Sequence, residues 1–187
     1  MAILVRQVLP EDADACGRAA YEAHTTVAAA HNLPSEHPSV EFSIGLIKAK
    51  VSDPNVYGCV AVQDGRIVGS VFLNTFPPEP VAAIGPLTVF PSAEGRTGRQ
   101  LMEAALTEAR RRGLERVRLV QSPSHLRSLV LYAKLGFTVR EPLILFQGTP
   151  PAARLPSEHH VRPTTPDDLA RCNTLCAGVH GFARDFE

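Results

Sequence analysis

The sequence predicts an α/β protein in which a mixed β-sheet is flanked by helices. Three observations support this. Two apolar segments rich in β-branched residues, 57–63 and 66–74, are joined by Asp64-Gly65, which is typical of a tight β-hairpin. Apolar residues recur at helical spacing before and after this hairpin. Residues 84–113 have the pattern of a strand, a loop with two glycines and an amphipathic helix, so strands and helices alternate in one domain.

The N-terminal part of the chain predicts one strand and two helices. Residues 2–8 are the first strand, and Pro10 with two following acids opens a helix that reaches about His31. A second helix is expected over residues 39–51. The apolar stripe of the first helix consists mostly of small side chains: Ala13, Cys16, Ala20, Ala23 and Val27.

The middle of the chain contains a proline-rich segment and then the strand–loop–helix unit. Residues 75–80 include three prolines and are expected to form a loop. The helix that follows the glycine loop is expected to end at Gly113. Its apolar face is predicted to comprise Leu101, Met102, Ala105, Leu106 and Ala109, and its opposite, solvated face Glu103, Thr107, Glu108 and Arg110.

The first domain is predicted to cover residues 1–148, and a proline-rich linker, residues 149–159, follows it. Gly136 suits the left-handed position after a helix. The last elements of this domain are a strand over residues 116–121, a helix over 125–135 and a strand over 138–146.

Residues 160–187 repeat the start of the chain at a constant offset of 156 positions. The residues that coincide are Val5, Arg6, Pro10, Asp12, Cys16 and His24 with Val161, Arg162, Pro166, Asp168, Cys172 and His180. We interpret this segment as the first strand and helix of a second copy of the domain that is cut short. It is too short to form its own core, so its apolar stripe is expected to dock on the first domain or on a second chain, as in a homodimer.

Composition argues against several classes of protein. The chain has 19 Lys+Arg and 19 Asp+Glu, whereas nucleic-acid and membrane-surface binders carry a basic surplus. Four cysteines are too few for a disulfide framework and indicate a reducing compartment. We find no signal peptide and no apolar run of membrane-spanning length, so the protein is predicted to be cytoplasmic.

The strand–loop–helix unit at residues 84–113 predicts an anion site. The first turn of a helix presents unpaired backbone N–H groups at the positive end of the helix dipole, and phosphate is the anion most often bound there. The mononucleotide and dinucleotide motifs G-x-x-x-x-G-K-[ST] and G-x-G-x-x-G are absent from the sequence, so a nucleotide of those classes is not predicted.

Two motifs occur in a recognisable order. Val89-Phe90-Pro91 precedes Gly98-Arg99-Gln100-Leu101-Met102 at the start of the predicted helix, and residues 125–137 end in Leu131-Tyr132-Ala133-Lys134-Leu135-Gly136-Phe137. The first resembles the acetyl-CoA loop of the GNAT superfamily of N-acetyltransferases. The second is similar to that superfamily's Asn-x-x-Ala-x-x-Leu-Tyr-x-x-x-Gly-Phe, with His125 and Ser128 replacing asparagine and alanine. The resemblance covers about residues 2–147 and implies the GNAT fold.

The resemblance also implies an activity: direct transfer of acetyl from acetyl-CoA to a primary amine of a small molecule or a protein. Tyr132 would protonate the departing CoA thiolate. A strand bulge is expected near Pro86, which lacks an N–H. Backbone groups at Leu87, Thr88 and Val89 would align the pantetheine and polarise the acetyl carbonyl. The pyrophosphate would lie on N–H groups from Arg96 to Gln100, so the other implied acetyl-CoA contacts are Gly95, Arg96, Thr97, Gly98, Arg99, Gln100, His125 and Ser128.

Several alternatives stay open at this level. The general base could be bulk water or one of Glu22, His24, His31, Glu36 and His37. A catalytically inactive CoA-sensing or interaction domain is the alternative function, because the loop has Arg96 or Thr97 where the family has a glycine. Cysteines 172 and 176 share a helix face with His180, but the spacing fits no common zinc pattern and no metal site is predicted.

Overall fold

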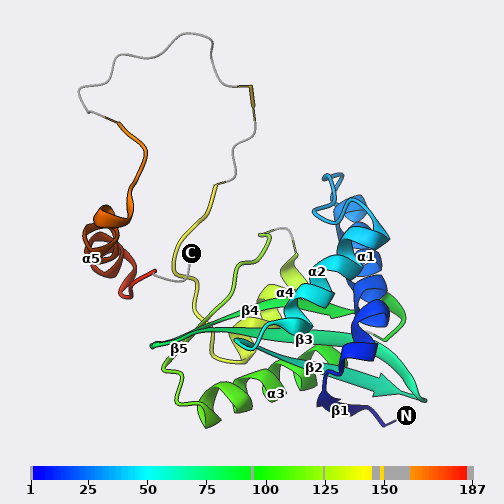
Figure 1. Ribbon diagram of the computed structural model, residues 1–187. Helices are drawn as coiled ribbons and strands as arrows, with labels where there is room; N and C mark the ends of the chain where they lie inside the picture. The colour runs from blue at the N-terminus through cyan, green and yellow to red at the C-terminus, as the bar shows by residue number, and fades with distance from the viewer. Residues whose placement is uncertain (1, 94, 124, 145–147, 150–160, 185–187) are drawn as a thin grey trace. The chain divides into compact units, whose positions relative to one another are not determined.

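The computed structural model of the chain describes residues 2–93, 95–123, 125–144, 148–149 and 161–184. They belong to two compact units, Met1–Gly136 and Phe137–Glu187. The first unit contains a β-sheet with helices on both faces (Figure 1). The predicted mixed sheet with flanking helices is therefore confirmed.

The sheet has five strands in sequence order, and their neighbours are antiparallel except for the last pair, which is parallel. The hairpin predicted at Asp64-Gly65 joins the second and third strands, with φ angles of 51° and 75° at its two residues. The strands are β1 (Leu4–Gln7), β2 (Val56–Gln63), β3 (Arg66–Phe76), β4 (Glu79–Val89) and β5 (Arg116–Arg118).

Two helices cover one face of this sheet, and a third covers the other (Figure 1). The first two are α1 (Ala13–Ala30), which follows the 3-10 turn η1 (Pro10–Asp12), and α2 (Val40–Ser52). Ser39 caps α2 by accepting a hydrogen bond from the Phe42 N–H. The opposite face carries α3 (Thr97–Arg111).

The small-residue stripe of α1 allows this helix to pack closely on α2 and on the sheet. A Cβ added at Gly17 would lie 2.5 Å from the Ile44 Cα, so only glycine fits there. Ala13 and Cys16 are buried and belong to one core cluster with Ile47, Val60 and Phe72.

The apolar face of α3 is buried largely as predicted, because Leu101, Met102, Ala105 and Ala109 are inaccessible. The prediction for Glu108 was wrong. Its side chain is almost buried, since Arg111 and Arg112 donate hydrogen bonds of 2.6–2.7 Å to its carboxylate oxygens. These bonds hold the pKa of Glu108 at about 2, so the carboxylate stays ionised.

Three element predictions need correction. The expected loop at residues 75–80 shrinks to a turn at Pro77-Pro78, because β3 and β4 pair almost to that point. The strand expected over 116–121 stops at Arg118, where its pairing with β4 ends. Among the described residues of the segment 138–146, which are 138–144, there is no strand.

The fourth helix, α4 (Leu126–Lys134), matches its prediction, and Gly136 follows it with φ 91°. In the second unit, the 3-10 turn η3 (Pro166–Asp168) leads into α5 (Leu169–His180). The described residues 161–165 form no strand, contrary to prediction, and most of the predicted linker lies outside the described residues. None of the helices in the described part of the chain combines the length and hydropathy needed to cross a membrane.

Candidate active site

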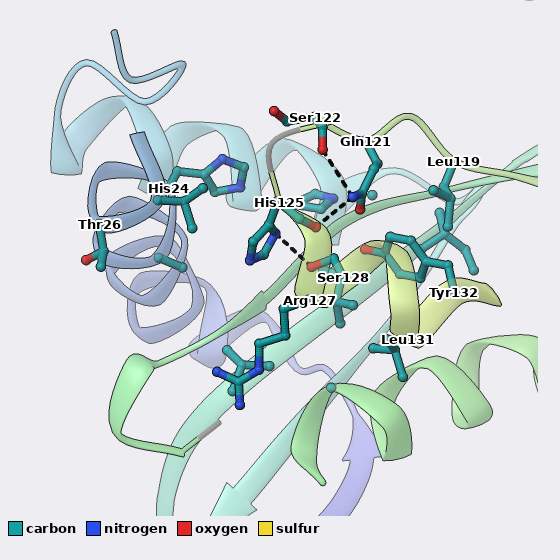
Figure 2. Close-up of a pocket in the computed structure, with 18 of the residues that line it drawn as sticks. His24, Thr26, Leu119, Gln121, Ser122, His125, Arg127, Ser128, Leu131 and Tyr132 are labelled. Atoms are coloured by element: carbon teal, nitrogen blue, oxygen red, sulfur yellow. Dashed lines mark hydrogen bonds between the residues drawn. The ribbon is translucent and has the colours of Figure 1, made fainter. Parts of the chain in front are cut away.

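A pocket of about 660 Å³ lies in the first unit where β5 diverges from β4. The two strands pair only up to Ala83 and Arg118. Beyond this point β4 lines the pocket on one side, and the chain that follows β5 lines it on the other. The C-terminal half of α1, the start of α3 and one face of α4 complete the walls (Figure 2). The pocket therefore contains backbone of β4 that no longer pairs with β5.

The predicted bulge is confirmed at this edge. Val71 pairs with Leu87 but Leu73 pairs with Ile84, so β4 has one extra residue next to Pro86. Leu87 and Val89 line the pocket, as expected. Thr88 does not face it, because its side chain is buried and its hydroxyl lies 3.1 Å from the Ser70 hydroxyl.

Asn74 holds the bulge from the α2 side of the sheet. Its side-chain nitrogen donates to the carbonyl oxygens of Ala83 (2.9 Å) and Gly85 (3.1 Å). The Lys50 ammonium donates to the Asn74 side-chain oxygen at 2.8 Å, and burial lowers the pKa of this lysine. Sequence reasoning missed both residues, because they lie 24 positions apart and neither belongs to a motif.

The start of α3 matches the predicted anion site only in part. Gly95, Arg96, Gly98 and Arg99 line the pocket. Two predicted acetyl-CoA contacts, Thr97 and Gln100, are not part of the pocket lining. Thr97 is buried and donates its hydroxyl to the Ala93 carbonyl at 2.7 Å. The Gln100 N–H donates to the Arg96 carbonyl at 3.0 Å and is thus used within the helix. The run of available N–H groups ends one residue earlier than predicted.

Charge is distributed unevenly along the pocket. Among its described lining residues, one carboxylate, Glu36, stands against four cations: Arg96, Arg99, Arg127 and Lys134. Arg99 is tied to Glu103 by a 2.8 Å bond, which limits its freedom to turn. Together with the dipole of α3, this surplus of positive charge suits a multiply charged anion. In the described part of the chain, no three His, Cys, Asp or Glu side chains come together in a way that could hold a metal ion.

One face of α4 contributes three polar side chains to the pocket: His125, Ser128 and Tyr132 (Figure 2). The Ser128 hydroxyl lies 2.7 Å from the His125 Nδ1. Burial raises the pKa of the Tyr132 phenol, and a hydrogen bond from Ser128 opposes this shift. Gln121, which sequence reasoning also missed, donates to the His125 carbonyl at 2.8 Å and fixes the start of the helix.

Only some of the candidate general bases lie at the α1 end of the pocket. His24 and Glu36 line it, whereas Glu22 and His31 are exposed side chains outside the lining. His37 is buried behind His24, with the ring centroids 4.0 Å apart, and its Nδ1 lies 2.8 Å from the Ser43 hydroxyl. Burial and the neighbouring His37 lower the pKa of His24 to about 4, so its imidazole is neutral at physiological pH.

Comparison with known proteins gives one curated relative and many similar structures. Mycothiol acetyltransferase from Thermomonospora curvata is 36% identical over 93 residues, which are 49% of this chain and 31% of that protein. The chain therefore spans less than a third of the length of this relative.

Solved structures show the same fold at low sequence identity. The BH1408 protein from Bacillus halodurans superposes with a TM-score of 0.66 and 15% identity, over 78% of this chain and 99% of the other. The PaiA N-acetyltransferase from Thermoplasma acidophilum, solved in complex with coenzyme A, superposes with a TM-score of 0.63 and 22% identity, over 76% of this chain and 93% of the other.

The model of the Acetyltransferase (GNAT) family matches residues 19–137, which is more than half of the chain. This range includes every wall of the pocket. The expected fold and the match to the family agree, and the chain belongs to the GNAT acetyltransferase family.

Proposed function

We propose that this chain transfers an acetyl group from acetyl-CoA to a primary amine of a small molecule or a protein, with both substrates bound at once. The observation that carries the proposal is the continuity of one pocket. It runs from the start of α3, past the part of β4 that β5 has left, to the end of α1. The relatives named above include acetyltransferases, one of them bound to coenzyme A, which supports the choice of acyl donor.

The start of α3 would hold the phosphates of acetyl-CoA. Gly95 has φ 120°, a conformation that favours glycine and lets the loop backbone turn into the helix. The pyrophosphate would accept hydrogen bonds from the N–H groups of the first turn, and Arg96 would add a charge-assisted bond. The pantetheine arm would then extend along β4, where Leu87 and Val89 reach the pocket.

The chemistry of transfer needs an attacking amine and a proton for the leaving thiolate. The amine would enter at the α1 end, where the neutral imidazole of His24 can accept a hydrogen bond from it and Glu36 can attract its ammonium form. The Tyr132 phenol stays protonated because burial raises its pKa, so it can give its proton to the thiolate.

The proposal is tested by following thiol release from acetyl-CoA across a panel of amines, together with calorimetry for CoA. We expect CoA binding and turnover with at least one amine. Tyr132→Phe should lower kcat by about a hundredfold and leave the Kd for CoA unchanged. If the chain neither binds CoA nor turns over, the proposal is wrong. CoA binding without turnover, insensitive to Tyr132→Phe, would support an inactive sensing or interaction domain instead.

Two further proposals concern the cell compartment and the C-terminal segment. Its four cysteines have free thiols, which supports a reducing compartment such as the cytoplasm. We also infer that residues 160–187 repeat the N-terminal strand and helix. Arg162 donates to both carboxylate oxygens of Asp168, as Arg6 does to Asp12 at the matching positions.

A further inference from the structure

Two polar residues of α4 and its N-cap residue, His125, form a connected row. His125, Ser128 and Tyr132 are spaced by three and four residues, so they share one face of the helix. All three line the pocket, and Figure 2 shows the Ser128 hydroxyl between the His125 ring and the Tyr132 phenol. The bond between His125 Nδ1 and Ser128 Oγ is 2.7 Å long. The row thus connects the mouth of the pocket near His24 with the residue proposed to protonate the thiolate.

The hydrogen bonds of the row can run in two directions, and only one of them carries a proton toward Tyr132. A serine hydroxyl has one proton to donate. In that direction the serine donates to the Tyr132 oxygen, which agrees with its effect of favouring the ionised form of the phenol. Its oxygen must then accept from His125 Nδ1–H, which leaves the Nε2 of that ring without a proton. In this arrangement every donor in the row points toward the Tyr132 oxygen.

We propose that His125 and Ser128 form a proton relay to Tyr132, which carries the proton lost by the attacking amine to the departing thiolate. This inference rests on the proposed function. It concerns the two positions at which this chain differs from the GNAT motif that residues 125–137 resemble. Asparagine and alanine stand there in the motif, and alanine has no hydroxyl, so the row needs both differences.

Every bond that forms in the relay is matched by a bond that breaks. The amine nitrogen attacks the thioester carbon, the C–N bond forms and the nitrogen gives one proton to His125 Nε2. The Nδ1 proton of the same ring passes to Ser128, the serine proton passes to the Tyr132 oxygen, and the phenol proton passes to sulfur. The C–S bond breaks with its electron pair on sulfur, which leaves as the thiol. The protein gains no net proton, and exchange with solvent returns His125 to its first tautomer.

The surroundings of His125 suit this role. Burial and the nearby His31 lower its pKa, so the ring is neutral before the amine arrives. Gln121 holds the backbone of His125 in place through its carbonyl. His24 lies close enough for a positive charge on either ring to disfavour protonation of the other. A neutral ring with one free nitrogen can take up a proton and release another, which a permanently charged group cannot do.

The relay is tested with Ser128→Ala and His125→Asn, which restore the residues of the motif. We expect each to lower kcat, measured at saturating acetyl-CoA because both residues line the pocket, by about tenfold while the Tm stays near that of the original protein. Ser128→Thr keeps a hydroxyl and should recover most of kcat. Combining Ser128→Ala with Tyr132→Phe should cost no more than Tyr132→Phe alone, because both act on one proton. Thr107→Ala, which removes an exposed hydroxyl on α3, is the matched control.

The outcomes separate the relay from the proposed function. If the original protein turns over but Ser128→Ala and His125→Asn keep its kcat, the relay is wrong and the acetyltransferase proposal stands. Additive losses in the double variant would also overturn the relay, because they would show that Ser128 and Tyr132 act on different steps. If the original protein binds CoA without turnover, the acetyltransferase proposal fails, and the relay, which rests on it, fails too.

Discussion

The start of α1 and the start of α5 have the same local structure. In the first, the Arg6 guanidinium donates to both carboxylate oxygens of Asp12, at 2.6 and 2.9 Å, and the carboxylate accepts the Leu9 N–H at 2.8 Å. In the second, Arg162 donates to Asp168 at 2.7 and 2.6 Å. The Asp168 carboxylate also accepts a hydrogen bond from the Thr165 N–H at 2.9 Å, as the Asp12 carboxylate does from the Leu9 N–H. Each carboxylate ends a 3-10 turn that runs directly into a helix.

The two regions differ in what surrounds them. Asp12 is 6% exposed, and Cys16, which follows it on α1, is fully buried against the sheet. On α5, Leu175 is 69% exposed and Val179 66% exposed. The comparison teaches that the same turn and helix start accompany an arginine and an aspartate six residues apart, with a proline between them, in both regions. The turn and the start of the helix therefore form alike where the helix is buried and where its own unit leaves it exposed.

The largest expected difference between the two regions is in thiol reactivity. Cys172 and Cys176 should react with a thiol reagent in the native protein at least about a thousandfold faster than Cys16, which can react only when the chain opens. Burial also raises the pKa of Cys16 to about 11. Timed alkylation with mass spectrometry measures the rates, and denatured protein is the control. Protection of Cys172 equal to that of Cys16 would contradict the prediction and show that the α5 stripe is covered.

A smaller difference is expected when each aspartate is removed. Asp12→Ala should lower the free energy of unfolding by about 2 kcal/mol, because it removes two charge-assisted bonds from Arg6 and leaves the Leu9 N–H without its acceptor. Asp168→Ala should leave the unfolding midpoint of the first unit unchanged. Urea unfolding followed by circular dichroism measures both. Equal losses would mean that the two regions share one cooperative structure.

The smallest expected effect is on the pH dependence of stability. The pKa of His24 is lowered from 6.5 to about 4 in the folded chain, so the unfolded chain takes up the proton first. The stability that neutral His24 contributes is complete above pH 6.5 and is lost as the pH falls toward 4. The lowered pKa corresponds to at most about 3 kcal/mol, which solvent screening of the partly exposed ring reduces to about 1 to 2 kcal/mol. The bonds from Arg6 lower the pKa of Asp12 below 3.8, so its contribution is lost only at still lower pH.

Thermal unfolding across this range checks the two pH windows. His24→Gln should flatten the profile between pH 6.5 and 4, and Asp12→Asn should flatten it below that window. The variant at the matching position of α5, His180→Gln, should leave the profile of the first unit as it is. A His24→Gln profile that still declines between pH 6.5 and 4 would assign the acid sensitivity to another group.

Much of the candidate site could be predicted because its residues lie in contiguous motifs. Leu87, Val89, Tyr132 and the pair His125 and Ser128 all reach the pocket. Their roles stay predictions. Thr97 and Gln100 lie outside the lining of the pocket, and the pattern could not show that one side chain turns inward and that one N–H closes the first helical turn. Asn74 and Lys50 meet only because α2 packs over the sheet, and no local pattern reports such packing.

The sequence by itself determined the elements that depend on hydrogen bonds between near neighbours. The Asp64-Gly65 hairpin, the turn before each aspartate and the helices with their caps form from contacts a few residues apart, so their patterns are legible in one dimension. Only the tertiary structure decided where β5 leaves β4, which carbonyls Asn74 holds and which polar side chains share the pocket. These depend on how the sheet and its helices pack, and packing joins residues that the sequence keeps far apart.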